Sequence, residues 1–130
     1  MTVWRGGMLL TDGRLNDDLP GDWQEVTFDE WGPGALSYAP LRVQKHGHRA
    51  RLDGHSQPES TFTGSQVAFT IPADLAPAYQ HYFSAVRITS GTPTLLGVVV
   101  ATSGSVTVYS STSIGSSDRF DFSRIEWPLD

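Results

Sequence analysis

Apolar and polar residues alternate in short segments through most of the chain after residue 34, and Gly, Ser, Asp or Pro residues separate these segments. A period of two residues is typical of a β-strand that has one face in a core and the other in solvent. About seven short strands at this spacing predict an all-β protein, an antiparallel β-sandwich similar to a jelly roll. The clearest alternating segments are Ala50 to Gly54, Val67 to Ile71, Val106 to Tyr109 and Phe120 to Phe122.

Two glycine-containing turns predict hairpins within this pattern, because glycine supplies the positive φ that tight turns need. One turn is His46-Gly47 and the other is Ser103-Gly104. The strand that returns from the first turn, residues 48–55, is expected to have one apolar and one polar face. The polar face would carry Arg49, Arg51, Asp53 and His55.

The remaining segments are less regular. We expect a strand from Leu36 to Lys45 that Pro40 interrupts, because proline cannot donate to a strand ladder. The prolines of residues 72–77 predict a rigid connection that is not a helix. Residues 57–60 and 111–117 are expected to be loops. The last strand should run from Arg119 to Trp127, with a register shift near residues 123–124.

The first 34 residues differ from the rest, since their pattern is irregular and they carry half of the 14 acidic residues. Leu10, Leu15 and Leu19 recur at a nearly helical spacing, which indicates one or two helical turns between residues 11 and 19. Glu25 to Phe28 is a candidate short strand. We therefore divide the chain into residues 1–34, a lead-in for attachment or trimer contact, and residues 35–130, the β-sandwich.

Composition excludes several classes of protein. The chain has 130 residues, which is enough for one domain with a sizeable core, and it has no cysteine for disulfides or thiolate chemistry. Its net charge of −5 argues against binding to nucleic acid, which needs a basic face. No segment has the roughly 20 apolar residues of a membrane span. The first residues lack the features of a signal peptide, so we expect synthesis in the host cytoplasm and no membrane insertion.

Catalytic and metal-binding patterns are weak. His46 and His48 could reach one ion, with Asp53 or His55 as a further ligand, but exposed polar residues of a hairpin are the preferred interpretation. The acidic pairs Asp17-Asp18 and Asp29-Glu30 lie in the irregular segment, where solvated surface is more common than a general acid and base. The serines of residues 110–113 lack a nucleophile motif. We expect no enzyme, no metal and no cofactor.

Four tryptophans are many for a chain of this size. Aromatic rings stack on the apolar faces of sugars, while planar polar side chains bind the hydroxyl groups. Core packing and subunit contact are the alternatives for each ring. Core packing is favoured for Trp127, whereas core and subunit contact are equally compatible with Trp23 and Trp31.

Several motifs along the chain together resemble the tail proteins of phages that infect actinobacteria. Residues 7–16 (GMLLTDGRLN) are similar to a lead-in of the form G-x-x-L-T-A-x-x-L-N. Further similarities to tail-fibre and receptor-binding heads are Trp31-Gly32, Tyr38, Gly47, residues 51–54 (RLDG), 71–78 (IPADLAPA), Tyr82-Phe83, 100–108 and 125–129 (IEWPL). The chain departs from the family pattern at Asp74 and at Ala76, where the family has Gly and often Arg.

The resemblance implies a β-sandwich head that forms a homotrimer at the tip of a tail fibre or baseplate, contacts other virion tail proteins, and binds host cell-wall saccharide. The three valines at residues 98–100 are apolar on both strand faces, which is consistent with burial of one face against a partner in addition to the core of the domain. The alternative is a structural tail, baseplate or decoration subunit that contacts only other virion proteins. The candidate ligand-binding residues are Arg49, Arg51, Asp53, His55 and Tyr82. The candidate subunit-contact residues are Trp4, Leu15, Leu19, Trp23 and Trp31.

Overall fold

The computed structural model of the chain describes residues 2–3, 9–10, 20–34, 39–89 and 92–130. This described part consists of antiparallel strands in sheets of two, eight and four strands, with one short 3₁₀ turn. No helix in it is long and apolar enough to cross a bilayer. The elements are β1 (Thr2–Val3), β2 (Leu9–Leu10), β3 (Pro20–Glu25), β4 (Thr27–Phe28), β5 (Trp31–Pro33), β6 (Arg42–His46), β7 (Arg49–Asp53), β8 (His55–Pro58), β9 (Phe62–Thr70), η1 (Ala73–Leu75), β10 (His81–Thr89), β11 (Thr92–Val100), β12 (Ser105–Ile114), β13 (Arg119–Asp121) and β14 (Glu126–Pro128).

The eight-stranded sheet, called the large sheet below, has the strand order β4-β9-β12-β11-β10-β13-β8-β5. Its two edge strands, β4 and β5, are consecutive in the chain and are joined by Asp29 and Glu30. The backbone N–H of Glu30 donates to Val67 of β9, and the carbonyl of Glu30 accepts from Glu59, which follows β8. The segment β4–β5 therefore bridges both ends of the sheet, so that the sheet nearly closes on itself.

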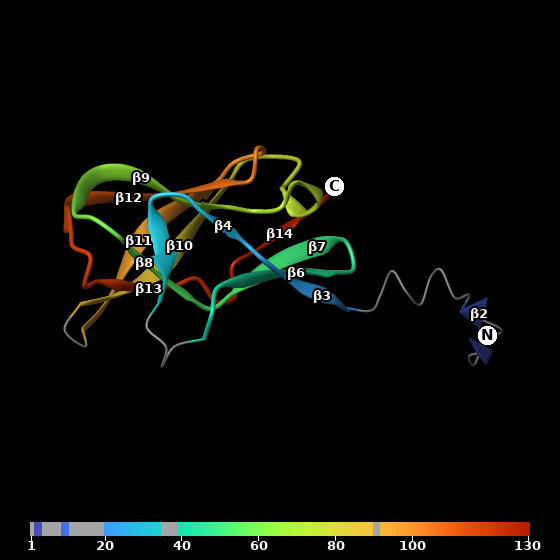
Figure 1. Cartoon of the computed structure of the whole chain (residues 1–130). Helices are drawn as coiled ribbons and strands as arrows, with labels where there is room; N and C mark the ends of the chain where they lie inside the picture. The colour runs from blue at the N-terminus through green and yellow to red at the C-terminus, as the bar shows by residue number, and fades with distance from the viewer. Residues whose placement is uncertain (1, 4–8, 11–19, 35–38, 90–91) are drawn as a thin grey trace.

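The four-stranded sheet, called the small sheet, has the order β14-β7-β6-β3. Three of its four strands are connected directly to strands of the large sheet: β3 leads into β4, β7 leads into β8, and β13 of the large sheet leads into β14 (Figure 1). The bend between β7 and β8 is at Gly54, with φ of 109°. A Cβ atom there would lie 2.0 Å from the carbonyl oxygen of Pro40, so this position requires glycine.

The core contains buried residues from both sheets and several large aromatic rings. Trp31 and Phe120 have ring centroids 4.7 Å apart, and Phe69 and Phe122 pack edge to face at 5.1 Å. Trp127 is fully buried, and its indole N–H donates to the carbonyl of Leu75 at 2.8 Å. The β-sandwich prediction and the core position of Trp127 are thus confirmed.

Both predicted hairpins are present. The first has the pairing His46↔Arg49, so its turn residues are Gly47 and His48, with φ of 64° at Gly47. The second connects β11 to β12, and Gly104 has φ of 91°. The predicted alternation in residues 48–55 is also observed, since Ala50 and Leu52 are fully buried.

Three local predictions were wrong. Residues 57–58 belong to β8 because they pair with β5, and residues 111–114 continue β12 because Ile114 is buried and pairs with Phe62. The last strand is interrupted instead of shifted, and β13 and β14 belong to different sheets on either side of Arg124, with φ of 69°. The connection at residues 72–77 contains a single 3₁₀ turn at residues 73–75, which Pro72 allows because a missing N–H is harmless where a helical turn begins. The helical turns predicted for residues 11–19 lie outside the described residues.

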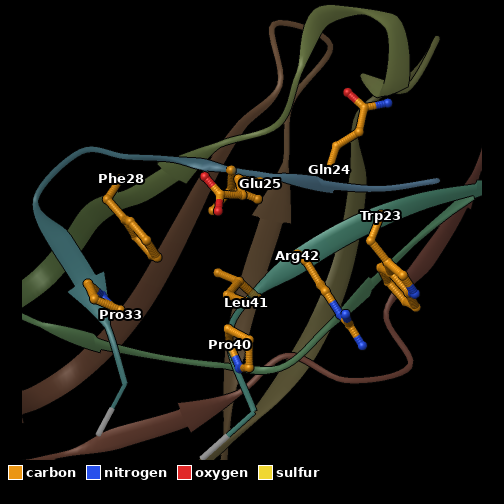
Figure 2. Close-up of a pocket in the computed structure, with 9 residues that line it drawn as sticks. Trp23, Gln24, Glu25, Phe28, Pro33, Pro40, Leu41 and Arg42 are labelled. Atoms are coloured by element: carbon orange, nitrogen blue, oxygen red, sulfur yellow. The ribbon is translucent and has the colours of Figure 1, made fainter. Parts of the chain in front are cut away.

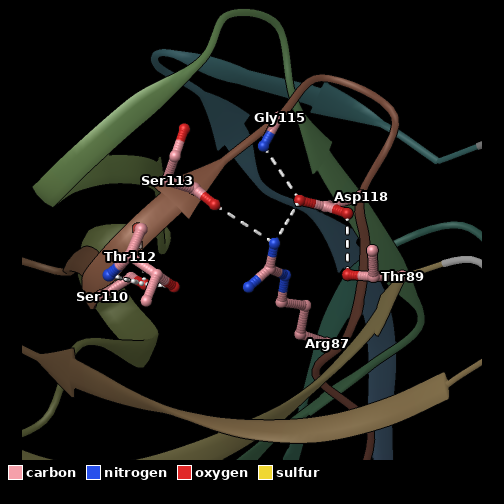
Figure 3. A network of polar contacts seen from close by, with 7 residues as sticks. All are labelled: Arg87, Thr89, Ser110, Thr112, Ser113, Gly115 and Asp118. Carbon is pink, nitrogen blue, oxygen red and sulfur yellow. Dashed lines mark hydrogen bonds and ion pairs between the residues drawn. The ribbon is translucent and has the colours of Figure 1, made fainter.

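A buried ion pair fixes the loop between β12 and β13 to β10 (Figure 3). Arg87 contacts the Asp118 carboxylate at 2.8 Å, and Asp118 also accepts from Thr89 Oγ1 and from the backbone N–H of Gly115. Burial raises the pKa of Asp118, but these hydrogen bonds and the charge of Arg87 outweigh it, so the pKa lies below its ordinary value. Asp118 is thus a structural carboxylate.

Candidate functional site

The outer face of the small sheet is rich in charged side chains, and we call it the charged face. Cross-strand pairing places Glu25, Arg42 and Asp53 in one row, and Gln44, Arg51 and Glu126 in the next. These rows combine acidic and basic groups, so the face carries both signs of charge. Its members are Trp23, Glu25, Arg42, Gln44, His46, Arg49, Arg51, Asp53 and Glu126.

Trp23 is the aromatic centre of the charged face. The guanidinium of Arg42 lies 4.3 Å from the ring centroid of Trp23, and that of Arg51 lies 5.4 Å from it. Such cation–π contacts stabilise exposed sites by about 0.5–1 kcal/mol. The ring of Trp23 is therefore already in contact with two side chains of its own chain.

A cavity of about 440 Å³ lies beside Trp23, between β3–β4 and the segment that enters β6. Figure 2 shows Trp23 and Arg42 on one side of it and Phe28 and Pro33 on the other, with Leu41 between them. Its size is in the range of small-molecule sites. The mixed lining combines an apolar floor with the charged groups of Glu25 and Arg42.

The outer face of the large sheet over β9–β12 has a different composition, and we call it the uncharged face. Strands β9, β11 and β12 contain no charged residue or histidine. Strand β10 contains His81 and Arg87, but both lie on the core side of the sheet with Phe83 and Ala85. Among the described residues, the uncharged face therefore has no ionisable group other than tyrosine. Its members are Thr63, Ser65, Val67, Tyr82, Ser84, Val86, Ile88, Pro93, Leu95, Gly97, Val99, Thr107, Tyr109 and Ser111.

Two exposed tyrosines flank a glycine on the uncharged face. Tyr82 is 74% exposed and Tyr109 48% exposed, on the strands either side of β11. Gly97 pairs directly with Tyr109, and a Cβ atom at Gly97 would meet no atom within 4 Å. The missing side chain leaves a hollow of about 480 Å³ whose floor includes Val99.

The structure does not bring the five predicted ligand-binding residues together. Arg49, Arg51 and Asp53 lie in β7 of the small sheet, whereas His55 belongs to β8 of the large sheet. His55 is only 17% exposed at its side chain and lies 3.8 Å from Asp121. Tyr82 lies on the uncharged face, in β10.

The predicted subunit-contact residues do not form one surface in the described part of the chain either. Trp31 is fully buried, and its indole N–H donates to Gln66 at 2.8 Å, so it belongs to the core. Trp23 is half-buried on the charged face. Trp4, Leu15 and Leu19 lie outside the described residues.

The weaker chemical patterns are accounted for by structural contacts where they are described. Asp29 accepts from Thr70 Oγ1 at 2.7 Å, and Glu30 accepts from Gln66 Nε2 at 2.6 Å. Within the described ranges, no three His, Asp, Glu or Cys side chains are grouped to hold a metal ion. Asp17-Asp18 falls outside these ranges.

Sequence reasoning missed Tyr109 and Gly97. The alternation of Val106 to Tyr109 carried enough signal to place Tyr109 on the outer face. The role of Gly97 depends on which residues lie across from it, and the sequence alone does not give that register.

Comparisons with known proteins give a fold. Protein-family models give no match, and curated protein sequences give none either. Solved structures do match, and two of them have a TM-score of 0.66 each. One is the head domain of lactococcal phage bIL170, described among receptor-binding domains of such phages, with 17% identity over 84% of this chain and 98% of that one. The other is the receptor-binding protein of Listeria phage PSA, with 15% identity over 88% of this chain and 68% of that one.

The chain thus has the fold of phage receptor-binding head domains. This confirms, for the fold, the resemblance to tail-fibre heads that the sequence motifs indicated.

Proposed function

We propose that this chain is a receptor-recognition head of a phage tail that binds a saccharide on the host cell surface and has no enzymatic activity. The single observation that carries this proposal is the pair of exposed rings, Tyr82 and Tyr109, on either side of the hollow over Gly97. Tyrosine presents an apolar ring face for a sugar ring and a hydroxyl for its polar groups. The likeness in fold to two phage receptor-binding structures supports the role.

Arg49, Arg51 and Asp53 form a second candidate surface with Trp23 on the charged face. This surface is less suited to stacking, because Arg42 and Arg51 already contact the indole ring. His55 is a weaker candidate than the three residues of β7, since most of its side chain is covered. We therefore assign the saccharide to the uncharged face.

In the proposed role the chain acts at the tip of the virion tail as a homotrimer, attached to other tail proteins. Three copies would multiply a weak affinity for one saccharide into a strong attachment. Native mass spectrometry checks this part, with a mass of three chains expected. A stable monomer at micromolar concentration would contradict it.

A structural subunit of the tail or baseplate is the second candidate function. The observation that favours it is Leu95, an apolar side chain on the uncharged face that is 68% exposed. Exposed apolar patches often mark contacts between proteins. Under this alternative the uncharged face would bind another virion protein and no saccharide.

Sedimentation with purified bacterial cell walls separates the two functions. Walls from a panel of species are used untreated, digested with protease, or oxidised with periodate, which cleaves sugar rings at neighbouring hydroxyl groups. We expect the protein to sediment with walls of at least one species, with binding that survives protease and is lost after periodate. Binding to none of the walls, or binding that protease removes, would contradict saccharide recognition.

A further inference from the structure

We infer that the uncharged face binds a linear glycan of at least two uncharged sugar units, laid across the strands in two hollows that Tyr109 separates. This inference rests on the proposed function and specifies its ligand. It is carried by the two hollows, by the ring between them, and by the absence of charge from the described residues of this face.

The first hollow lies over β11, between Tyr82 and Tyr109. Its lining residues are Gln80, Tyr82, Phe83, Gly97, Val98, Val99 and Tyr109. Gln80 Nε2 donates to the hydroxyl of Tyr82 at 2.8 Å, which orients that side chain at the edge of the hollow. A sugar ring placed over Gly97 would contact aromatic or aliphatic carbon on both sides and below.

The second hollow lies on the other side of Tyr109, over the pairing of β12 with β9. It measures about 380 Å³ and is lined by Gly64, Ser65, Tyr109, Ser110 and Ser111. Gly64 has φ of 95°, and a Cβ atom there would meet nothing within 4 Å. Glycine therefore leaves space on both sides of the same tyrosine ring.

Hydroxyl groups give the second hollow its polarity. Ser110 Oγ is engaged with Thr112 of its own strand at 2.9 Å. For Ser65 and Ser111, the described part of the chain offers no side-chain hydrogen bond, and both serines are exposed. A hydroxyl both donates and accepts, so these two serines match the hydroxyl groups of a sugar.

The spacing of the hollows requires a ligand longer than one sugar. The first hollow lies over β11 and the second lies between β12 and β9, while neighbouring strands are about 4.8 Å apart. A ligand that fills both spans roughly 10 Å across the strands, which exceeds a single pyranose ring. The two hollows thus predict a glycan chain that bends over the ring of Tyr109 or stacks on it.

The lack of charge on the uncharged face determines the chemical class of the glycan. A glycan with carboxylate or phosphate groups would lose hydration at the two hollows without gaining a cation, because β9 to β12 place no Arg, Lys or His on this face. Arg119 lies on the same side of the sheet but in β13, beside Ile88, and lines neither hollow. An uncharged glycan has no such cost. Acidic wall polymers would be better matched to the arginines of the charged face.

A glycan array tests the inference. The array carries neutral and acidic glycans of one to six units, and the best ligands are then measured by calorimetry. Gly97→Val fills the first hollow on a strand where valine is well tolerated, and Leu95→Val is the matched control, with the same new side chain two residues away on the same face. Tyr109→Ser removes the ring between the hollows and serves as a second variant.

We expect the wild-type protein to bind neutral glycans of two or more units, with at least about tenfold weaker binding to the corresponding monosaccharide. Gly97→Val and Tyr109→Ser should each weaken binding about tenfold or more, whereas Leu95→Val should change it less than roughly twofold. Circular dichroism and thermal unfolding confirm that each variant is folded.

Four results would overturn the inference: equal affinity for one and for several units, binding of acidic glycans alone, binding that both Gly97→Val and Tyr109→Ser leave unchanged, or no binding to any glycan. In the third case the proposed function survives if the protein still sediments with cell walls. The last result, together with failure to sediment, favours a protein partner and contradicts both.

Discussion

The charged face of the small sheet and the uncharged face of the large sheet arise from the same alternation of inward and outward residues, but their outward residues differ. On the charged face, Trp23 is in contact with the guanidinium groups of Arg42 and Arg51. On the uncharged face, Tyr82 and Tyr109 are exposed beside a glycine. The aromatic ring of the charged face is thus in contact with side chains of its own chain, while the rings of the uncharged face are exposed and available to a ligand. This difference is why we assign the ligand to the uncharged face.

The largest expected effect concerns Gly54, which joins the two sheets. Gly54→Ala should destabilise the protein by more than about 4 kcal/mol, because the new Cβ atom would collide with the backbone of Pro40 and the residue would keep a positive φ. Gly64→Ala is the matched control, since Gly64 also has a positive φ but has open space around it. It should cost about 1 kcal/mol, from backbone strain alone.

Urea unfolding of both variants measures this difference. Similar losses for Gly54→Ala and Gly64→Ala would show that the close approach to Pro40 is not a constraint on the junction of the sheets.

Ion pairs give the next comparison. Asp118 pairs with Arg87 at 2.8 Å, with side chains only 6% and 16% exposed, while Arg49 and Glu126 are 3.4 Å apart with side chains 49% exposed. Asp118→Asn should cost about 3 kcal/mol because it leaves a buried arginine without its counter-charge. Glu126→Gln should cost less than about 1 kcal/mol, as exposed pairs do. Equal effects in urea unfolding would refute the structural role of Asp118.

The same carboxylate predicts an acid dependence. The pKa of Asp118 is lowered in the folded protein, so its contribution to stability is complete above the unfolded value of about 4 and is lost as the pH falls through the lower folded value. The wild-type protein should therefore lose more stability between pH 7 and pH 3 than Asp118→Asn does. Parallel pH profiles of the free energy of unfolding for the two proteins would contradict this.

The smallest expected effect compares the aromatic rings of the two faces. Trp23→Ala should cost about 1 kcal/mol, because it removes the contacts with two arginines. Tyr82→Ala should change stability by less than about 0.5 kcal/mol, since the side chain of Tyr82 is mostly exposed. Thermal unfolding measures both. A larger loss for Tyr82→Ala would mean that Tyr82 supports the fold and is less available to a ligand.

The sequence predicted the sandwich because period-two alternation depends on local order alone. It placed Ala50 and Leu52 inward and Arg49 and Arg51 outward, as the structure does. It did not predict that the chain passes between sheets at Gly54 and at Arg124, because such a transition depends on which strands lie across from each other. Because the sequence does not reveal the transition at Gly54, it assigns His55 to the same polar strand face and the same site as Arg49 and Arg51, although His55 belongs to the other sheet.

The candidate site was predictable only in part, for the same reason. Tyr82 was identified as an aromatic residue of a strand, and its neighbour in space, Tyr109, is 27 residues further along the chain. The hollow between them exists because Gly97 pairs with Tyr109. Register between strands is a tertiary property, and turn signals and hydrophobic patterns constrain it only within a hairpin.

The most direct test of the account is to map the bound ligand by NMR. The ¹⁵N-labelled protein is titrated with the neutral glycan that binds best on the array, and shifts of the backbone amide signals are followed. We predict that the largest shifts fall on Gly64, Ser65, Gly97 and Tyr109, with little change at Arg42 and Arg51. The largest shifts at Trp23, Arg42 and Arg51, with an unchanged spectrum at Gly97, would contradict the assignment of receptor recognition to the uncharged face.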